Sequence, residues 1–177
     1  MSSSWTFLRG RQDDDARFHF GATMTLADLK HLLHYTRWAN SQIIEEMLSH
    51  VDAPPRAVTW LAHNLAAEHL WIDRMTNDPR NHLVWPDWKL YECLEQQQEL
   101  ARRWEKFFTG MSDDDLDRKV TYTNSQGNEF TNSVREILTH LVLHAPHHRG
   151  QINAELRAMG FEPPWIDYIQ AVRTKQI

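Results

Sequence analysis

Apolar residues recur at three- and four-residue steps in four long segments of the chain, which is the period of an amphipathic α-helix. In the first segment this stripe includes Leu26, Leu29, Leu33, Ile43 and Met47. The four segments span residues 25–49, 55–75, 88–109 and 133–159. A helix of about 20 residues is about 30 Å long, so side chains from all four can meet in one core. The pattern therefore predicts an all-α protein, an up-down bundle of four helices.

Local signals mark the helix starts and one small insertion. Thr25 and Ser133 precede apolar runs and have acidic residues three positions later, which is typical of helix N-caps. Residues 120–131 carry β-branched and aromatic side chains on both sides of a polar turn that contains Gly127. This pattern predicts a short β-hairpin before the last long helix. A short amphipathic stretch, residues 165–173, follows that helix.

Chain length favours a single domain. The 177 residues are enough for one domain of ordinary size. Met24 directly precedes the first helical pattern, whereas residues 1–23 have no such pattern and contain three consecutive acidic residues. We expect residues 1–23 to form an accessory or poorly ordered tail and residues 24–177 to form the helical domain.

Charge and cysteine usage narrow the function classes. The net charge of −5 argues against a nucleic-acid partner, which would require a basic face. No apolar run reaches the length of a membrane-spanning helix, so we expect no membrane association. The single cysteine, Cys93, excludes a disulfide framework and a cysteine-based zinc site. With no export signal, one thiol is typical of a cytoplasmic protein.

The eleven histidines are the most informative feature of the composition. His144 and His148 lie four residues apart, on the face of the last helix that carries its apolar stripe. Two imidazoles at this spacing can chelate one divalent ion, and a third ligand is needed from elsewhere. His63 in the second helix is the leading candidate. The competing interpretation is that these are ordinary hydrogen-bonded core histidines. Pro146, between the paired histidines, predicts a kink or a fresh helix start there.

Three motifs resemble those of the DinB family, within the wider DinB/YfiT-like group. The first is Arg37-Trp-Ala-Asn in the first helix, and the second begins at His63 and continues through Glu68 to Trp71. The third and most specific joins His140, His144 and His148 to the Arg-Gly-Gln that follows. The resemblance implies an up-down-down-up four-helix bundle and a metal site whose ligands are His63, His144 and His148. It also implies nickel or zinc as the metal, and a homodimer.

The resemblance does not determine one activity. Relatives in the wider group are similar to thiol-dependent S-transferases and isomerases that use bacillithiol or mycothiol, and others to hydrolases. The expected function is therefore a metal-dependent transferase or hydrolase with a small-molecule substrate and a low-molecular-weight thiol. Glu68 and Arg149 are the catalytic candidates, although both are expected at the surface. Helical phasing points Arg149 away from the inner face, and Glu68, which could orient a ligand or act as a base, is expected to form a surface salt bridge.

The alternative is a non-catalytic bundle that binds a metal or a partner. It rests on tryptophans outside the apolar stripes, which could form an exposed patch or a dimer interface. These tryptophans are Trp5, Trp85, Trp88 and Trp165.

Overall fold

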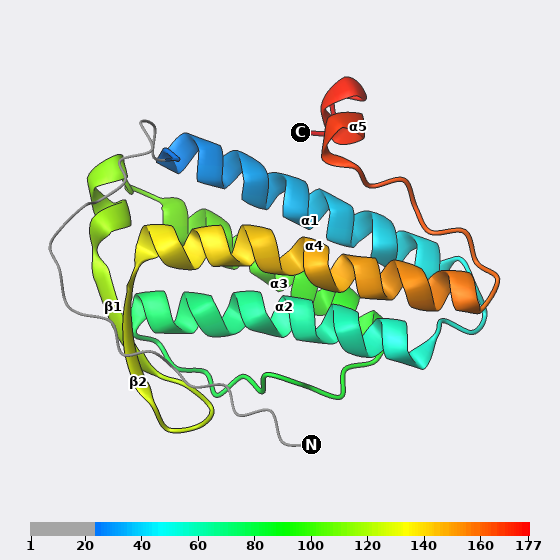
Figure 1. The fold of residues 1–177 in the computed structure, drawn as a ribbon, viewed down its shortest axis with the longest axis horizontal. Coiled ribbons are helices and arrows are strands. Elements are labelled where there is room, and N and C mark those ends of the chain that lie inside the picture. The colour runs from blue at the N-terminus through cyan, green and yellow to red at the C-terminus, as the bar shows by residue number, and fades with distance from the viewer. Residues whose placement is uncertain (1–23) are drawn as a thin grey trace, which may run out of the picture.

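The computed structural model describes residues 24–177, which are mainly helical (Figure 1). The expectation for residues 1–23 lies outside this range. The long helices are α1 (Leu26–Leu48), α2 (Pro55–Thr76), α3 (Leu90–Phe108) and α4 (Val134–Ala158). Each of α1 and α2 packs against both α3 and α4. Figure 1 shows α1 and α4 running in one direction and α2 and α3 in the other, with a long connection between α2 and α3. The prediction of an all-α protein is confirmed at this level.

The helix boundaries follow the local signals closely. Thr25 and Ser133 are N-caps of α1 and α4, and each forms a capping box with the acidic residue three positions later. The helix α3 begins at Leu90, two residues later than predicted, because Lys89 is its N-cap. Pro146 lies inside α4, which continues through it, so a fresh helix start at this proline is wrong.

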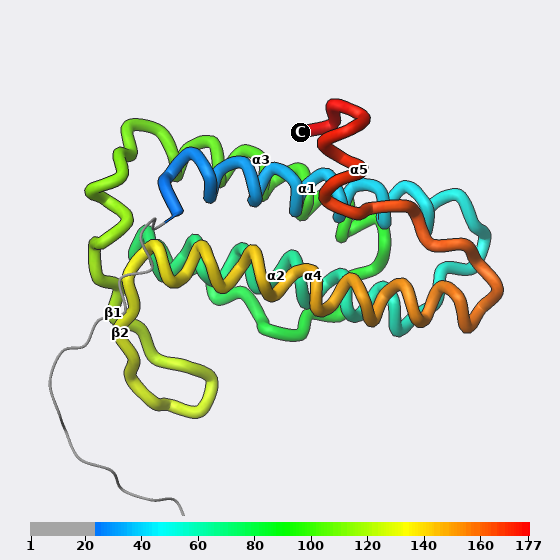
Figure 2. Tube along the Cα trace, turned by 45° about the horizontal axis from the view of Figure 1, so that its top comes forward, coloured from blue at the N-terminus to red at the C-terminus, as the bar shows by residue number. Residues whose placement is uncertain are grey.

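A two-stranded hairpin connects α3 to α4. After the short 3-10 helix η1 (Asp113–Asp117), strand β1 (Lys119–Thr123) pairs antiparallel with β2 (Glu129–Ser133). Gly127 has a φ of +83° in the turn, a conformation that favours glycine. Both views place the hairpin at the end of the bundle where α4 begins (Figure 1, Figure 2). The predicted hairpin is therefore confirmed, and it brings Tyr122 within 4.8 Å of the Trp71 ring on α2, measured between ring centroids.

The interior between the helices is apolar, but it is interrupted by several buried polar side chains. Leucine and isoleucine side chains from all four helices form one continuous core. Asn40, Glu68 and Arg149 are also buried within the bundle. The short helix α5 (Tyr168–Arg173) follows α4 and lies beside α1, where Tyr168 contacts Tyr35. Among residues 24–177, no helix is long and apolar enough to cross a membrane.

Candidate metal centre

Neighbouring helices bring three histidines together. His63 lies on α2, and His144 and His148 lie one turn apart on α4. One ring nitrogen from each histidine lies within 4.8 Å of those of the other two. Two nitrogens bound to one tetrahedral ion at about 2.0–2.1 Å are about 3.3 Å apart, so small rotations of the rings would close the site. The structure thus brings together the three residues that the sequence nominated.

Two of the imidazoles are held by a hydrogen bond on one of their ring nitrogens, Nδ1. The Nδ1 atom of His63 donates to the carbonyl oxygen of Val84 at 2.8 Å. The Nδ1 atom of His148 donates to Oε1 of Gln151. Each bond leaves the Nε2 lone pair of its ring available to an ion. Outer partners of this kind orient metal-bound histidines and raise their basicity.

The third imidazole carries an unsatisfied polar atom. Nε2 of His144 is buried and has no hydrogen-bond partner among the described residues. A buried polar group without a partner costs about 1–3 kcal/mol, so such atoms are uncommon unless something fills the position. The donor set of three neutral nitrogens fits nickel or zinc better than calcium or magnesium, which prefer oxygen.

The surroundings keep the cluster uncharged. Burial lowers the pKa of His63 and of His148 below the usual value of 6.5. Burial, together with the neighbouring histidines, lowers the pKa of His144 to about 4. The neutral imidazole is the form that binds metal ions, so the three rings are in the binding form at neutral pH.

Two tryptophans pack on the ligand rings from one side. Trp85, in the α2–α3 connection, stacks on His63 with ring centroids 3.8 Å apart and planes within 11°. Trp60 stacks on His148 at 5.1 Å and also contacts Trp85. Sequence reasoning assigned neither tryptophan to the metal site. The one available signal was the isolated aromatic Trp85 within a loop.

Two further histidines of α4 border the cluster. The His140 ring lies 5.1 Å from the His144 ring, and the His147 ring lies 5.0 Å from the His148 ring. Neither belongs to the group whose nitrogens meet within 4.8 Å. Both are exposed, so they line the outside of the cluster.

The predicted surface positions of the two catalytic candidates are wrong. Glu68 is 2% exposed and its Oε2 accepts a hydrogen bond of 2.7 Å from the indole nitrogen of Trp104. Arg149 is also 2% exposed, and it lies 5.2 Å from the Tyr35 ring and donates to Asn40. Both side chains face the interior because α2 and α4 each pack against two other helices. Neither contact places a catalytic group on the histidine cluster.

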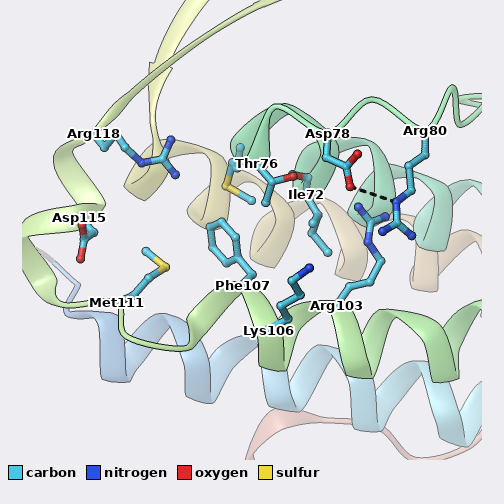
Figure 3. Close-up of a pocket in the computed structure, with 11 residues that line it drawn as sticks. Ile72, Thr76, Asp78, Arg80, Arg103, Lys106, Phe107, Met111, Asp115 and Arg118 are labelled. Atoms are coloured by element: carbon cyan, nitrogen blue, oxygen red, sulfur yellow. Dashed lines mark hydrogen bonds and ion pairs between the residues drawn. The ribbon is translucent and has the colours of Figure 1, made fainter.

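A separate cavity lies away from the three clustered histidines. It has a volume of about 460 Å³ and opens where α2 and α3 end (Figure 3). Two of the four cations that line it are held in ion pairs, since Arg103 pairs with Asp73 and Arg80 pairs with Asp78. A third cation, Lys106, lies in the last turn of α3 and complements the negative end of that helix. We therefore assign this cavity no part in the metal centre.

Comparisons with known proteins agree on one family. The family model for the DinB family matches residues 23–176. The structure is similar to the crystal structure of a DinB-like protein from Bacillus cereus ATCC 10987, with a TM-score of 0.57 and 14% sequence identity. That match covers 81% of this chain and 99% of the Bacillus chain. No curated protein matches the chain. Because the family model spans nearly all of the described residues, the chain belongs to the DinB family.

Proposed function

We propose that this protein binds one divalent metal ion, nickel or zinc, through His63, His144 and His148, and that it is a metal-dependent enzyme. The observation that carries the proposal is the meeting of three neutral ring nitrogens within 4.8 Å, one of them buried without a partner. Three protein ligands leave positions on the ion open to other molecules, which is typical of catalytic rather than structural sites.

The reaction class that we propose is a thiol-dependent S-transfer or a hydrolysis on a small molecule. When bound, the ion would lower the pKa of a coordinated thiol or water. The chain supplies no thiol of its own to the cluster, since Cys93 is buried on α3 and is not among the grouped residues. A thiolate at this site would therefore come from a bound low-molecular-weight thiol.

The protein's own residues would position and shield this chemistry. The bond from His63 to the carbonyl of Val84 ties the α2–α3 connection to the site. Trp85 then covers one side of the His63 ring and keeps water from it. The Arg149 guanidinium lies near Asn40 and Tyr35, which supports a role in holding α1 against α4.

Metal analysis tests the first half of the proposal. Protein purified without a nickel resin is expected to contain one divalent ion per chain, or to bind one in calorimetric titration. His144→Ala should weaken binding by more than about 100-fold, because changes to mere outer partners already cost 10–100-fold. His147→Ala is the matched control on the same helix and should bind normally. Equal binding by wild type and His144→Ala would rule the site out.

Cobalt substitution tests the reaction class. A thiolate bound to cobalt gives an intense charge-transfer absorption, which bacillithiol, mycothiol or glutathione should produce in the loaded wild type and not in His144→Ala. If all three thiols leave the cobalt spectrum unchanged, a hydrolase gains support. If, in addition, no hydrolysable ester or amide is turned over, a non-catalytic metal-binding bundle is favoured.

We also propose the finer assignments that follow from the family. The shared direction of α1 and α4, opposite to that of α2 and α3, supports the up-down-down-up class of four-helix bundle (Figure 1). A homodimer is proposed, and sedimentation of the intact chain would reveal it. A small-molecule substrate is proposed in place of a nucleic acid, in keeping with the net charge of −5.

A further inference from the structure

A small cavity lies between α2, the β-hairpin and α4, and its wall includes His140, the residue one helical turn before the proposed ligand His144. It has a volume of about 270 Å³ and is lined by Trp71, Tyr122, Asn132, Glu136, Ile137 and His140. Its residues come from α2, from both strands of the hairpin and from α4. This volume lies just below the usual range for ligand pockets, about 300–1,000 Å³, so it suits a small group.

His140 connects this cavity to the metal centre. Its ring lies 5.1 Å from that of His144 and 5.7 Å from that of Trp71. Neither ring nitrogen of His140 has a hydrogen-bond partner among the described residues. The cavity therefore begins one helical turn from a proposed metal ligand. Its other residues on α4, Glu136 and Ile137, precede His144 by about two helical turns, or roughly 10 Å along the helix axis.

Three of the polar side chains that line the cavity, those of Tyr122, Asn132 and Glu136, are hydrogen-bonded to one another. The Tyr122 hydroxyl donates to Oδ1 of Asn132 at 2.9 Å, and Nδ2 of Asn132 donates to Oε2 of Glu136 at 3.3 Å. The same Glu136 oxygen accepts the backbone N–H of Ser133 in the capping box of α4. A ligand would gain little by replacing these bonds, so the surface left for recognition is the aromatic pair of Trp71 and Tyr122, Ile137 and the His140 ring.

The aromatic pair has a fixed geometry. The rings of Trp71 and Tyr122 meet edge to face with centroids 4.8 Å apart. The guanidinium of Arg74 lies 4.6 Å from the Trp71 ring and 4.5 Å from the Tyr122 ring, and it donates to the carbonyl oxygen of Thr123. Such contacts hold both rings in place. A corner of two aromatic rings accepts a third planar ring by stacking or edge contact.

We propose that this cavity is the substrate pocket of the metal centre and that it takes a planar apolar group, aromatic or conjugated. The group would be joined by a short linker to the atom that binds the metal. This inference rests on the proposed function, and it specifies the substrate class of the same site. It also gives the hairpin a role, because β1 supplies Tyr122 as one wall.

The test compares thiols with and without a phenyl group on cobalt-loaded protein. The series is ethanethiol, benzyl mercaptan, 2-phenylethanethiol and 3-phenylpropanethiol, with dissociation constants read from the thiolate-to-cobalt absorption. The best phenyl thiol should bind about tenfold more tightly than ethanethiol, since it buries additional apolar area. Saturation-transfer NMR on metal-free protein should show contact with the phenyl ring.

Two variants test whether the aromatic pair causes the preference for phenyl thiols. Trp71→Leu and Tyr122→Leu should abolish the preference for phenyl thiols while ethanethiol affinity and cobalt content stay unchanged. Tyr122 lies in strand β1 of the hairpin, so its substitution changes no residue of the helices. Trp165→Leu, at a tryptophan that is 69% exposed near the C-terminus, is the control and should keep the preference.

The outcomes separate the pocket from the metal site. Equal affinities across the thiol series, or a phenyl preference that survives both pocket variants, would overturn the pocket assignment. Contact with the phenyl ring in NMR but no thiolate absorption would support the pocket and contradict the proposed metal chemistry. Absence of both signals would overturn the pocket and the metal chemistry together.

Discussion

At the scale of single residues, the lowered pKa values of the three histidines have a direct consequence for metal binding. A lowered pKa means that protons compete with the metal only in more acidic solution. The apparent affinity should therefore be nearly constant from about pH 8 to about pH 7, and it should fall in more acidic solution as His63 and His148 become protonated. Calorimetric titration with zinc in a series of buffers measures this dependence. Affinity that already falls between pH 8 and pH 7 would contradict it.

Glu68 provides a second prediction at this scale. Burial raises its pKa from 4.5 to about 7, so the folded state keeps a proton that the unfolded state loses. Stability is thus lost as the pH rises from about 4.5 to about 7. Glu68→Gln keeps a hydrogen-bond acceptor for Trp104 and removes the titrating group. The free energy of unfolding of the variant, relative to that of the wild type, should therefore increase across that pH range, by up to about 3 kcal/mol. Urea unfolding at several pH values measures it.

A matched substitution controls for a general effect of removing charge. Glu105→Gln lies on α3 next to Trp104, but its side chain is exposed. Its free energy of unfolding should follow the wild-type pH dependence. If Glu68→Gln and Glu105→Gln behave alike, the buried carboxyl is not the source of the effect.

The residues that were wrongly placed show where helical phasing fails. Phasing treats a helix as having one buried stripe and one exposed face. In this bundle α4 packs against both α1 and α2, and α2 packs against both α3 and α4. The buried arc of each helix is therefore wider than its apolar stripe, and it includes Glu68, Arg149 and also His69, which is 1% exposed. Apolar periodicity cannot reveal polar residues that are buried by a second neighbour.

At the scale of elements, helices and loops differ in how well the sequence predicts them. The long helices and the hairpin carry their own periodic patterns and caps, so their positions follow from nearby residues. The path of residues 77–89 depends instead on a tertiary contact, the bond between His63 and Val84. No local pattern encodes that bond. The sequence therefore predicts the three clustered histidines but not the tryptophan that covers them.

The loop contact gives a prediction that fluorescence can test. Open-shell ions such as cobalt or nickel quench tryptophans that lie close to them. Trp85 and Trp60 stack on the proposed ligands, so metal binding should quench part of the total tryptophan emission. Trp85→Phe should remove a large share of that quenching without changing the number of ions bound. Trp165→Phe should leave the quenching intact, and an unchanged signal in Trp85→Phe would contradict the placement of the loop.

At the scale of the whole molecule, the proposed site joins α2 to α4 across the bundle. An ion that binds the three histidines binds only the folded chain, because His63 is about 80 residues away from the other two in sequence. Binding of this kind stabilises the folded state by an amount that depends on the free ion concentration. This stabilisation requires the assembled bundle, because neither α2 nor α4 alone contains all three ligands.

Thermal unfolding should therefore report on the site without any knowledge of the substrate. At a free zinc concentration 100 times the dissociation constant, the stabilisation is about 2.7 kcal/mol. For a domain of this size that corresponds to an increase of about 5–10 °C in the midpoint. His147→Ala should show the full increase, whereas His144→Ala should show none, and a chelator should reverse the increase in both wild type and control. An increase of equal size in His144→Ala would mean that zinc binds elsewhere on the folded chain.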